Sequence, residues 1–352
     1  MVGFTILAGA YSSVISALRF IPGPTPVCRH GHLSMTRLSD IGFEQSATNE
    51  LTDGLLLTFT VGSEGELDLI QEVTSGGNGP ANLLALSRSD EVAILNYGSG
   101  NGMVYSLEPD LVHVVTNPPP PLITFNPAPN LISHPHEALE VGDQLFVTDL
   151  GADKIWRLNK TPSQTWEISS FIQQVNGTGP RHMALKNDIL FVVDETASLL
   201  TSQRIPPNGV TSPQFIEHLL TTPAGVNSTD YTAAEIQIPP PIDGSSQMFI
   251  FVSNRQIAGV EDVRGDPIAV FLAHDDGSFK LINEVFTGLN NLRGFIFDPS
   301  GRYLVAGGNI AGGIKIYERV GDGSRLVEVA ATTQVPTASS FVWLPKQYDT
   351  RS

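Results

Sequence analysis

The sequence predicts an all-β fold built from repeated blades, a β-propeller. One observation is a repeat: a turn, a short strand, a tight connection and a second, more apolar strand recur along the chain, with starts spaced by roughly 45 to 60 residues. This spacing is the scale of a four-stranded propeller blade. The other observation is composition, since 33 glycines, 25 prolines and only 16% charged residues suit many short strands joined by tight turns rather than helices.

The clearest repeat unit runs through Gly179–Leu185 and Ile189–Glu195, with charged groups at the start of its first strand and at the end of its second. Other units share this pattern and begin at Gly79, His134, Ala233, Leu292 and Ala338. Six units are therefore visible. We take residues 1–352 as a single propeller domain, because β-rich repeat folds of this size commonly form one closed body.

The N-terminal stretch predicts two strands, Thr5–Ala10 and Val14–Phe20, joined through Tyr11–Ser13. The last predicted strand, Ser340–Leu344, has no partner after it in the sequence. Pairing the N-terminal strands with this C-terminal strand would close the ring and remove the open edge of a sheet. We therefore expect the two ends of the chain to be neighbours.

Residues 22–47 fit the repeat poorly, because prolines crowd the start of this stretch and no paired apolar strands follow. A hairpin returns with Leu55–Val61 and Glu66–Val73. We therefore expect an irregular segment in place of a regular first blade, either a degenerate blade or an insertion. Further along the chain, the run Pro118–Pro121 predicts a rigid loop.

Cys28 is the only cysteine, so the chain can form neither an internal disulfide nor a thiolate metal cluster. A metal site made by Cys28, His30 and His32 is disfavoured because these are few ligands. The formal charge of −16 disfavours nucleic acid and anionic membrane surfaces as partners. No stretch approaches the roughly 20 apolar residues of a membrane span, and the N-terminus lacks the basic region of a signal peptide. We expect a cytoplasmic protein, with secretion and the oligomeric state left open.

Several short motifs resemble those of the seven-bladed propeller lactonase family, which includes bacterial-type 6-phosphogluconolactonases and fungal carboxy-cis,cis-muconate cyclases. The motifs are Gly179-Pro180-Arg181-His182, Val193-Asp194-Glu195, Ala234-Glu235 with Ser253-Asn254-Arg255, Arg293-Gly294-Phe295, and Asp298-Pro299-Ser300-Gly301-Arg302-Tyr303. The resemblance covers most of the chain from about residue 50 to 344 and the first strands, while residues 22–47 depart from it. It implies a seven-bladed β-propeller and a metal-independent site, so we expect no metal and no cofactor.

Residues at equivalent positions of successive blades converge at the central channel of a propeller. Five side chains could share a pocket in this way, and they are His136, Arg181, Glu195, Arg255 and Arg293. Opening a lactone requires an attacking water, a base, stabilisation of the developing oxyanion and an acid for the leaving alkoxide. Forming a lactone by cycloisomerisation needs the same set of groups.

His136 is the first candidate for acid–base catalysis, because imidazole exchanges a proton near neutral pH. The resemblance points to the histidine in this blade position, but His134, two residues away on the same strand face, is an alternative. Glu195 could orient His136, act as the base, or pair with Arg181. A turn histidine that only bonds a neighbouring carbonyl is the structural alternative for His136.

The three arginines of these motifs suggest anion binding, since a guanidinium grips carboxylate or phosphate with two hydrogen bonds. The alternative is that each arginine forms a structural salt bridge between blades. The predicted catalytic residues are His136, Glu195, Arg181 and Arg255. The predicted substrate-binding residues are His134, Arg293, Glu235 and Asn254.

Residues and resemblance together predict an enzyme, a lactonase that opens a small anionic sugar lactone such as 6-phosphogluconolactone. One alternative is a carboxy-cis,cis-muconate cyclase, in which the arginines would bind carboxylates and His136 or Glu195 would move the proton. A second alternative is a non-catalytic propeller that serves as a binding platform, because a fold does not imply an activity. The expected partner is a small anionic lactone or carboxylate, with no nucleic acid and no membrane.

Overall fold

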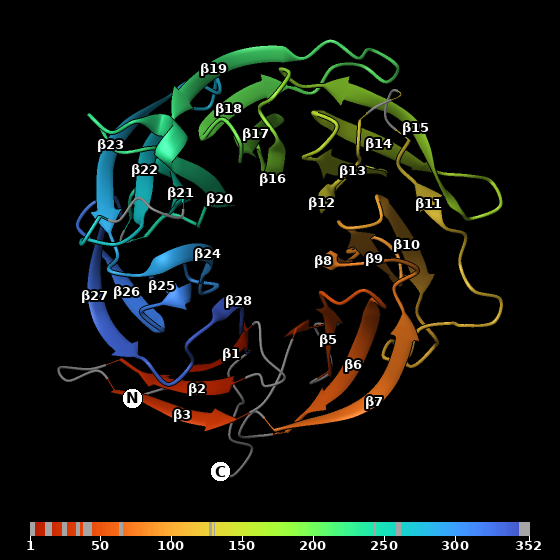
Figure 1. The fold of residues 1–352 in the computed structure, drawn as a ribbon, viewed down its shortest axis with the longest axis horizontal. Helices are drawn as coiled ribbons and strands as arrows, with labels where there is room; N and C mark the ends of the chain where they lie inside the picture. The colour runs from red at the N-terminus through yellow and green to blue at the C-terminus, as the bar shows by residue number, and fades with distance from the viewer. Residues whose placement is uncertain are drawn as a thin grey trace.

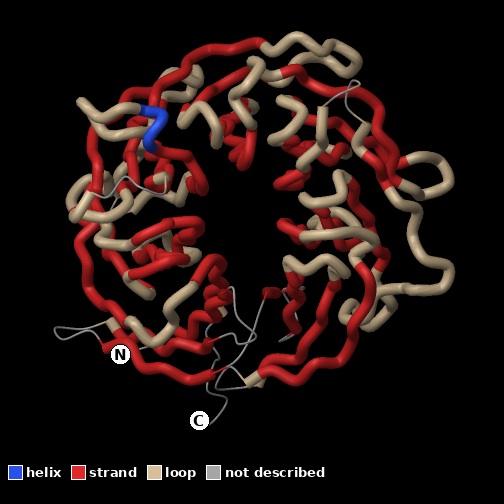
Figure 2. The backbone as a smooth tube through the Cα atoms, in the orientation of Figure 1, coloured by secondary structure: helices blue, strands red, loops and turns tan. Residues whose placement is uncertain are grey.

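The computed structural model describes residues 4–10, 16–22, 27–32, 36–37, 44–62, 66–126, 129, 131–242, 244–257 and 262–344. Within these residues the strands form seven four-stranded antiparallel sheets, arranged like blades around a central axis (Figure 1). The predicted all-β, seven-bladed propeller is confirmed. A single short 3₁₀ helix, η1 (Ser228–Asp230), interrupts the strands and loops of the described chain (Figure 2). None of the described residues belongs to a helix long and apolar enough to cross a membrane.

From the innermost to the outermost strand, the closing sheet contains β28 (Ala338–Trp343), β1 (Phe4–Ala10), β2 (Ser16–Ile21) and β3 (Val27–His32). Sheet 2 contains β4 (Thr36–Arg37), β5 (Glu44–Asn49), β6 (Leu55–Val61) and β7 (Leu67–Thr74), and sheet 3 contains β8 (Pro80–Ala85), β9 (Glu91–Asn96), β10 (Asn101–Ser106) and β11 (Ile123–Thr124). Sheet 4 contains β12 (Pro135–Val141), β13 (Gln144–Asp149), β14 (Lys154–Lys160) and β15 (Trp166–Gln173), and sheet 5 contains β16 (Pro180–Lys186), β17 (Ile189–Asp194), β18 (Leu199–Arg204) and β19 (Gln214–Leu220). Sheet 6 contains β20 (Tyr231–Gln237), β21 (Met248–Gln256), β22 (Pro267–Ala273) and β23 (Phe279–Phe286), and sheet 7 contains β24 (Asn290–Phe297), β25 (Tyr303–Ala311), β26 (Ile314–Val320) and β27 (Arg325–Thr332).

The closing sheet takes strands from both ends of the described chain. β28 pairs antiparallel with β1, with Leu7 opposite Val342, and β1 pairs on its other side with β2. Phe4 of β1 packs edge-on against Trp343 of β28, with the ring centroids 5.5 Å apart. An aromatic pair of this kind is worth about 0.5–1.5 kcal/mol beyond its buried area. The predicted connection Tyr11–Ser13 lies outside the described residues.

Residues 22–47 contain strands in the part that the structure describes. β3 is the outermost strand of the closing sheet, and β4 and β5 are the two inner strands of sheet 2. Their sequences, such as Glu44–Asn49, are mostly polar, so they lack the paired apolar runs that mark the strands of the other blades. The backbone nevertheless pairs, β3 with β2 and β5 with β6, so less of the stretch is irregular than expected. The side chains of the considered His/Cys metal site lie outside the described residues.

The second strands of the regular sheets are the most buried part of the fold. β9 and β17 are buried along their whole length. Neighbouring sheets cover both faces of such a strand, and this explains the continuous apolar runs in the sequence. Between sheets 5 and 6, the Phe279 ring lies 6.3 Å from Phe191 and 5.5 Å from Phe271, centroid to centroid. Because burying one such side chain contributes about 1.5–3 kcal/mol, packing between blades holds the ring together.

A β-bulge near the start of the innermost strand recurs from sheet to sheet. In sheet 5, Pro180 lies opposite Asp194 and His182 lies opposite Val193, so Arg181 is an extra residue in the ladder. A bulge re-aims a side chain and is over-represented next to active sites. The same register shift occurs in sheets 3, 4, 5 and 7, and the extra residues are Ala81, His136, Arg181 and Arg293.

Candidate active site

Two repeated positions supply the side chains of the candidate site. The first is the bulge residue of the innermost strand, and the second is the residue that follows the Asn or Asp near the end of the second strand. Residues at this second position are Glu50, Tyr97, Leu150, Glu195 and Arg255. Because the innermost strand runs antiparallel to the second, with Pro180 opposite Asp194, both positions lie at the same edge of a sheet.

In sheets 3 to 6, the Asn or Asp that precedes the second position is buried and anchors neighbouring groups. Asp149 accepts hydrogen bonds from the backbone N–H of His134 at 2.7 Å and from the Trp156 indole at 2.8 Å. Asn254 is fully buried, and its amide donates to the Thr221 carbonyl at 2.7 Å and accepts from the Thr221 hydroxyl at 2.6 Å. Both ends of the Asn254 amide are therefore engaged in holding a loop, and these contacts do not support its predicted role in binding substrate.

Glu195 is held between two arginines. Its Oε2 atom lies 2.7 Å from Arg181 Nε and 2.8 Å from Arg255 Nη2. Each guanidinium also donates to a carbonyl of β20, Arg181 to Ala234 and Arg255 to Ala233. Burial alone would raise the pKa of Glu195, but the Arg255 and Arg181 charges lower it below its ordinary value. Glu195 therefore remains a carboxylate at neutral pH.

Arg181 is the most enclosed of the three predicted arginines. Its side chain is 2% exposed, against 23% for the Glu195 side chain that it contacts. Burial, together with the neighbouring Arg255 charge, lowers the pKa of the Arg181 guanidinium to about 9, although Glu195 acts in the opposite direction. A buried cation is tolerated when it is paired and hydrogen-bonded. These contacts favour support of Glu195 by Arg181 over direct binding of a substrate anion.

His136 lies beside this cluster and is only 4% exposed. Its ring is edge-on to Tyr97, with the centroids 5.9 Å apart, and its centroid is 4.9 Å from that of His182. Burial lowers the pKa of His136 well below 6.5, and the positive charges of Arg181 and His182 lower it further. The Nδ1 atom is buried without a hydrogen-bond partner among the described residues. The imidazole is therefore neutral at neutral pH and can accept a proton.

A buried ionic network borders His136. His182 Nδ1 lies 3.2 Å from Glu235 Oε1 and 3.4 Å from Glu137 Oε1. Burial would lower the pKa of His182, but the Glu235 and Glu137 carboxylates raise it to about 9, so this imidazole is a cation at neutral pH. Glu137 also accepts a hydrogen bond from the backbone N–H of Met183 and thereby links sheets 4 and 5. Glu235, a predicted substrate ligand, is thus engaged with His182.

Tyr97 is a residue of the candidate site that the sequence reasoning missed. Its ring stacks on His134 with the centroids 4.3 Å apart and the planes at 12°, and His134 Nδ1 lies 2.9 Å from the Tyr97 carbonyl oxygen. Burial, with a contribution from Glu195, raises the pKa of Tyr97, so the phenol keeps its proton at neutral pH. The signal that would have found it is its place after Asn96, which matches the place of Glu195 after Asp194.

Arg293 and Glu50 form an ion pair, with Arg293 Nη2 3.6 Å from Glu50 Oε1. Arg293 belongs to β24 of sheet 7, whereas Glu50 follows β5 of sheet 2, and the closing sheet lies between these two sheets in the ring (Figure 1). The Arg293 side chain is 25% exposed and that of Glu50 is 36% exposed. Solvent therefore reaches this pair more easily than it reaches Arg181.

Comparison with known proteins assigns this architecture to a family. The family model described as "Lactonase, 7-bladed beta-propeller" matches residues 44–343. The chain belongs to this lactonase family. The resemblance expected from the sequence motifs is thereby confirmed, and the family match includes every residue of the candidate site.

Relatives of this lactonase-family chain include two proteins named 6-phosphogluconolactonase. That of Bacillus subtilis is 26% identical over 282 residues, which covers 78% of this chain and 76% of the relative. That of Formosa agariphila is 25% identical over 304 residues, which covers 82% of this chain and 81% of the relative. Among solved structures, the periplasmic gluconolactonase of Pseudomonas aeruginosa has a TM-score of 0.79 at 18% identity and covers 98% of this chain and 99% of its own. At that identity the likeness shows a shared fold.

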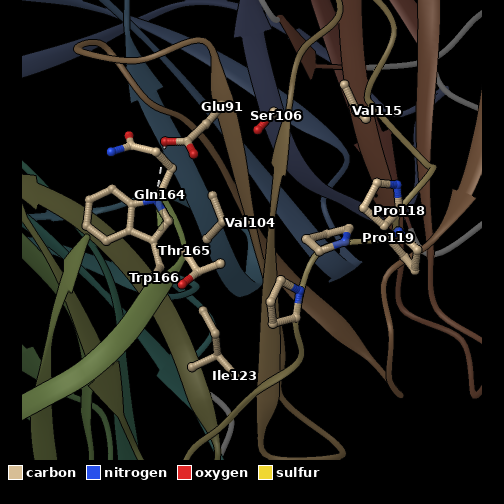
Figure 3. Close-up of a pocket in the computed structure, with 12 residues that line it drawn as sticks. Glu91, Val104, Ser106, Val115, Pro118, Pro119, Ile123, Gln164, Thr165 and Trp166 are labelled. Atoms are coloured by element: carbon tan, nitrogen blue, oxygen red, sulfur yellow. Dashed lines mark hydrogen bonds between the residues drawn. The ribbon is translucent and has the colours of Figure 1, made fainter. Parts of the chain in front are cut away.

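In the part of the chain that the structure describes, no three His, Cys, Asp or Glu side chains are grouped so as to hold a metal ion. A hollow of about 160 Å³ is lined by the predicted rigid loop Pro118–Pro121 and by Trp166, whose indole donates to Glu91 at 3.2 Å (Figure 3). Glu91 begins β9 and Tyr97 follows its end, so this hollow is separate from the candidate site.

Proposed function

We propose that this protein hydrolyses a small anionic sugar lactone, with 6-phosphogluconolactone as the first substrate to test. The observation that carries the proposal is a neutral, buried His136 that senses the charge of Arg181, one of the two arginines that clamp the Glu195 carboxylate. A neutral imidazole accepts a proton, and fixed donors stabilise the negative charge that develops in a transition state. Membership of the lactonase family and the names of the two relatives support the same class of reaction.

In the proposed reaction, a water molecule attacks the carbonyl carbon of the lactone while His136 takes one of its protons. The new carbon–oxygen bond turns the carbonyl oxygen into an oxyanion. Arg255 stabilises this oxyanion, because its side chain is 10% exposed and Glu195 fixes its position. The intermediate then collapses with cleavage of the ring carbon–oxygen bond, and protonated His136 gives the proton to the leaving alkoxide. The product is the open-chain hydroxy acid, and His136 is neutral again.

Glu195 contributes as a permanent carboxylate. Its pKa is held below the ordinary value by the two arginines that it pairs with, so it stays ionised in this scheme and the proton transfer is assigned to His136. The carboxylate instead accepts a hydrogen bond from the attacking water and orients it. Arg181 is a positioning residue, since it acts on the substrate through its contact with Glu195 and through its charge beside His136.

The ring-forming chemistry of a carboxy-cis,cis-muconate cyclase would use the same groups. There the arginines would bind the carboxylates of the substrate, and His136 or Glu195 would move the proton. The names of the two relatives favour hydrolysis. We therefore treat the cyclase reaction and a purely binding role as outcomes of the test below.

The test is the rate of 6-phosphogluconolactone opening above its spontaneous background, measured for the native chain and for His136→Gln and Glu195→Gln. His218→Gln is the matched control, because His218 is exposed on the outermost strand β19. We expect the native chain and the control to accelerate opening. His136→Gln should lose at least about 100-fold in rate, in line with the usual worth of a general base, and Glu195→Gln should also lose rate because the attacking water is no longer oriented. Far-ultraviolet circular dichroism checks that the variants are folded.

No acceleration by well-folded native protein would refute the proposed substrate. Disappearance of the diene absorbance of a carboxylated muconate would then identify the cyclase reaction. Binding of phosphorylated or carboxylated sugars without turnover would identify a binding platform.

A further inference from the structure

The three arginines of the candidate site differ in how far a ligand can reach them. The side chains of Arg181 and Arg255 are 2% and 10% exposed, and both contact Glu195 at 2.7–2.8 Å. The side chain of Arg293 is 25% exposed, and its distance to Glu50 is longer, at 3.6 Å. The cation that a solvent-borne anion meets first is therefore Arg293.

The position of Glu50 in the blade repeat places its side chain beside Arg293. It follows Asn49 at the end of β5, in the same repeated position that Glu195 occupies after β17. The two glutamates thus have parallel placements, each beside an arginine at the same edge of the ring. They differ in burial, since the Glu195 side chain is 23% exposed and that of Glu50 is 36% exposed.

The difference in burial separates a fixed pair from an exchangeable one. A solvent-exposed ion pair gains little from its contact, because water and salt screen both charges. A phosphate or carboxylate can offer a guanidinium two parallel hydrogen bonds, which is a stronger arrangement than an ion pair with its two atoms 3.6 Å apart. An anionic ligand can therefore replace Glu50 at Arg293 more readily than it can replace Glu195 between its two buried arginines.

We propose that Glu50 is a specificity-determining residue, an internal counter-ion that occupies Arg293 until the anionic group of the substrate takes its place. This inference rests on the proposed function, because it assumes that the site receives an anionic lactone. Glu50 opposes the binding of that anion in two ways: it competes for Arg293, and its own negative charge repels the ligand. Both effects grow with the charge of the substrate, so Glu50 sets the preference between charged and uncharged lactones.

The test compares two lactones that share a ring and differ in charge, 6-phosphogluconolactone and glucono-δ-lactone. The variants are Glu50→Gln, Arg293→Gln and the double variant, with Glu72→Gln as control because it removes one exposed carboxylate from the outer strand β7. For Glu50→Gln we expect the ratio of KM for the phosphorylated lactone to KM for the unphosphorylated one to fall about 3- to 10-fold. Arg293→Gln should raise the ratio, and the double variant should show no gain from Glu50→Gln.

Equal changes in both KM values, or a gain from Glu50→Gln that persists without Arg293, would overturn the inference. The role of Glu50 can also be tested by a binding measurement that does not depend on the proposed hydrolysis. If neither lactone is turned over, calorimetric titration of 6-phosphogluconate and gluconate into the same variants measures the same selectivity by affinity. A tighter binding of 6-phosphogluconate to Glu50→Gln, lost in the double variant, would support the role of Glu50 even where hydrolysis fails. Unchanged affinity would refute it.

Discussion

Replacing His182 with Gln tests the buried ionic network beside His136. In the native protein, His182 is a cation between the Glu235 and Glu137 carboxylates, at 3.2 and 3.4 Å. Removing it leaves two largely buried carboxylates, whose side chains are 18% and 16% exposed, without their shared counter-ion. Breaking a buried pair in this way costs about 3–5 kcal/mol, so urea unfolding at pH 7 should show a loss of that size in the free energy of unfolding.

The double variant His182→Gln, Glu235→Gln is the matched control for this loss. It removes the cation together with one of its two carboxylates, so we expect part of the stability to return relative to His182→Gln alone. Equal stabilities of the single and double variants would show that His182 and Glu235 are not coupled. In that case the two residues would only fill space between sheets 5 and 6.

The same network predicts how stability depends on pH. The pKa of His182 is about 9 in the folded protein and 6.5 ordinarily, so its contribution is complete below pH 6.5 and is lost as pH rises through 9. A shift of this size corresponds to at most roughly 3–4 kcal/mol. The pKa of Glu235 is held below 4.5, so its contribution is present above that pH and is lost as pH falls further. Native protein should therefore lose stability between pH 6.5 and 9, and His182→Gln should not; a flat native profile would contradict the reasoning.

Three further predictions concern single side chains. Arg181→Met removes one of the cations that lower the pKa values of both His136 and Glu195, so both should rise and the acid limb of kcat/KM against pH should move to higher pH; an unmoved limb would argue against their coupling to Arg181. Tyr97→Phe keeps the stack on His134 and should change the unfolding free energy by less than about 0.5 kcal/mol, whereas Tyr97→Ala should cost about 0.5–1.5 kcal/mol more, measured in urea. Phe191→Ala should cost about 3–5 kcal/mol, because Phe191 is fully buried between sheets 5 and 6; a loss below about 1 kcal/mol would contradict that packing.

The blades could be predicted because their second strands carry a clear signal. Ile189–Asp194 is a nearly continuous apolar run, and the structure buries every residue of it. β5 gave no such signal, because Glu44–Asn49 is polar and is a strand through its pairing with β6. Backbone pairing with a neighbouring strand leaves no periodic trace of its own in the side chains.

The candidate site was predictable as a set of residues, and less so as a set of contacts. His136, Arg181, Glu195 and Arg255 stand in repeated motif positions, which is how the sequence reveals them; their proposed roles stay predictions. The depth at which Arg181 is buried depends on how the bulge turns its side chain toward sheet 6. The sequence pattern predicts the repeated position of Arg181 but not this orientation. Tyr97 escaped notice because a tyrosine after a buried strand is usually read as part of the core.

The closing sheet has a consequence for biosynthesis. β1 leaves the ribosome before the other strands, yet its inner edge stays open until β28 has been made, because that edge pairs with residues 338–343. Each of the other six sheets takes its strands from one continuous stretch and can form in the order of synthesis. An open strand edge is a template for pairing with another chain. A premature stop codon shortly before β28 would thus yield six complete blades beside a three-stranded remnant, and the expected fate of that product is aggregation and degradation.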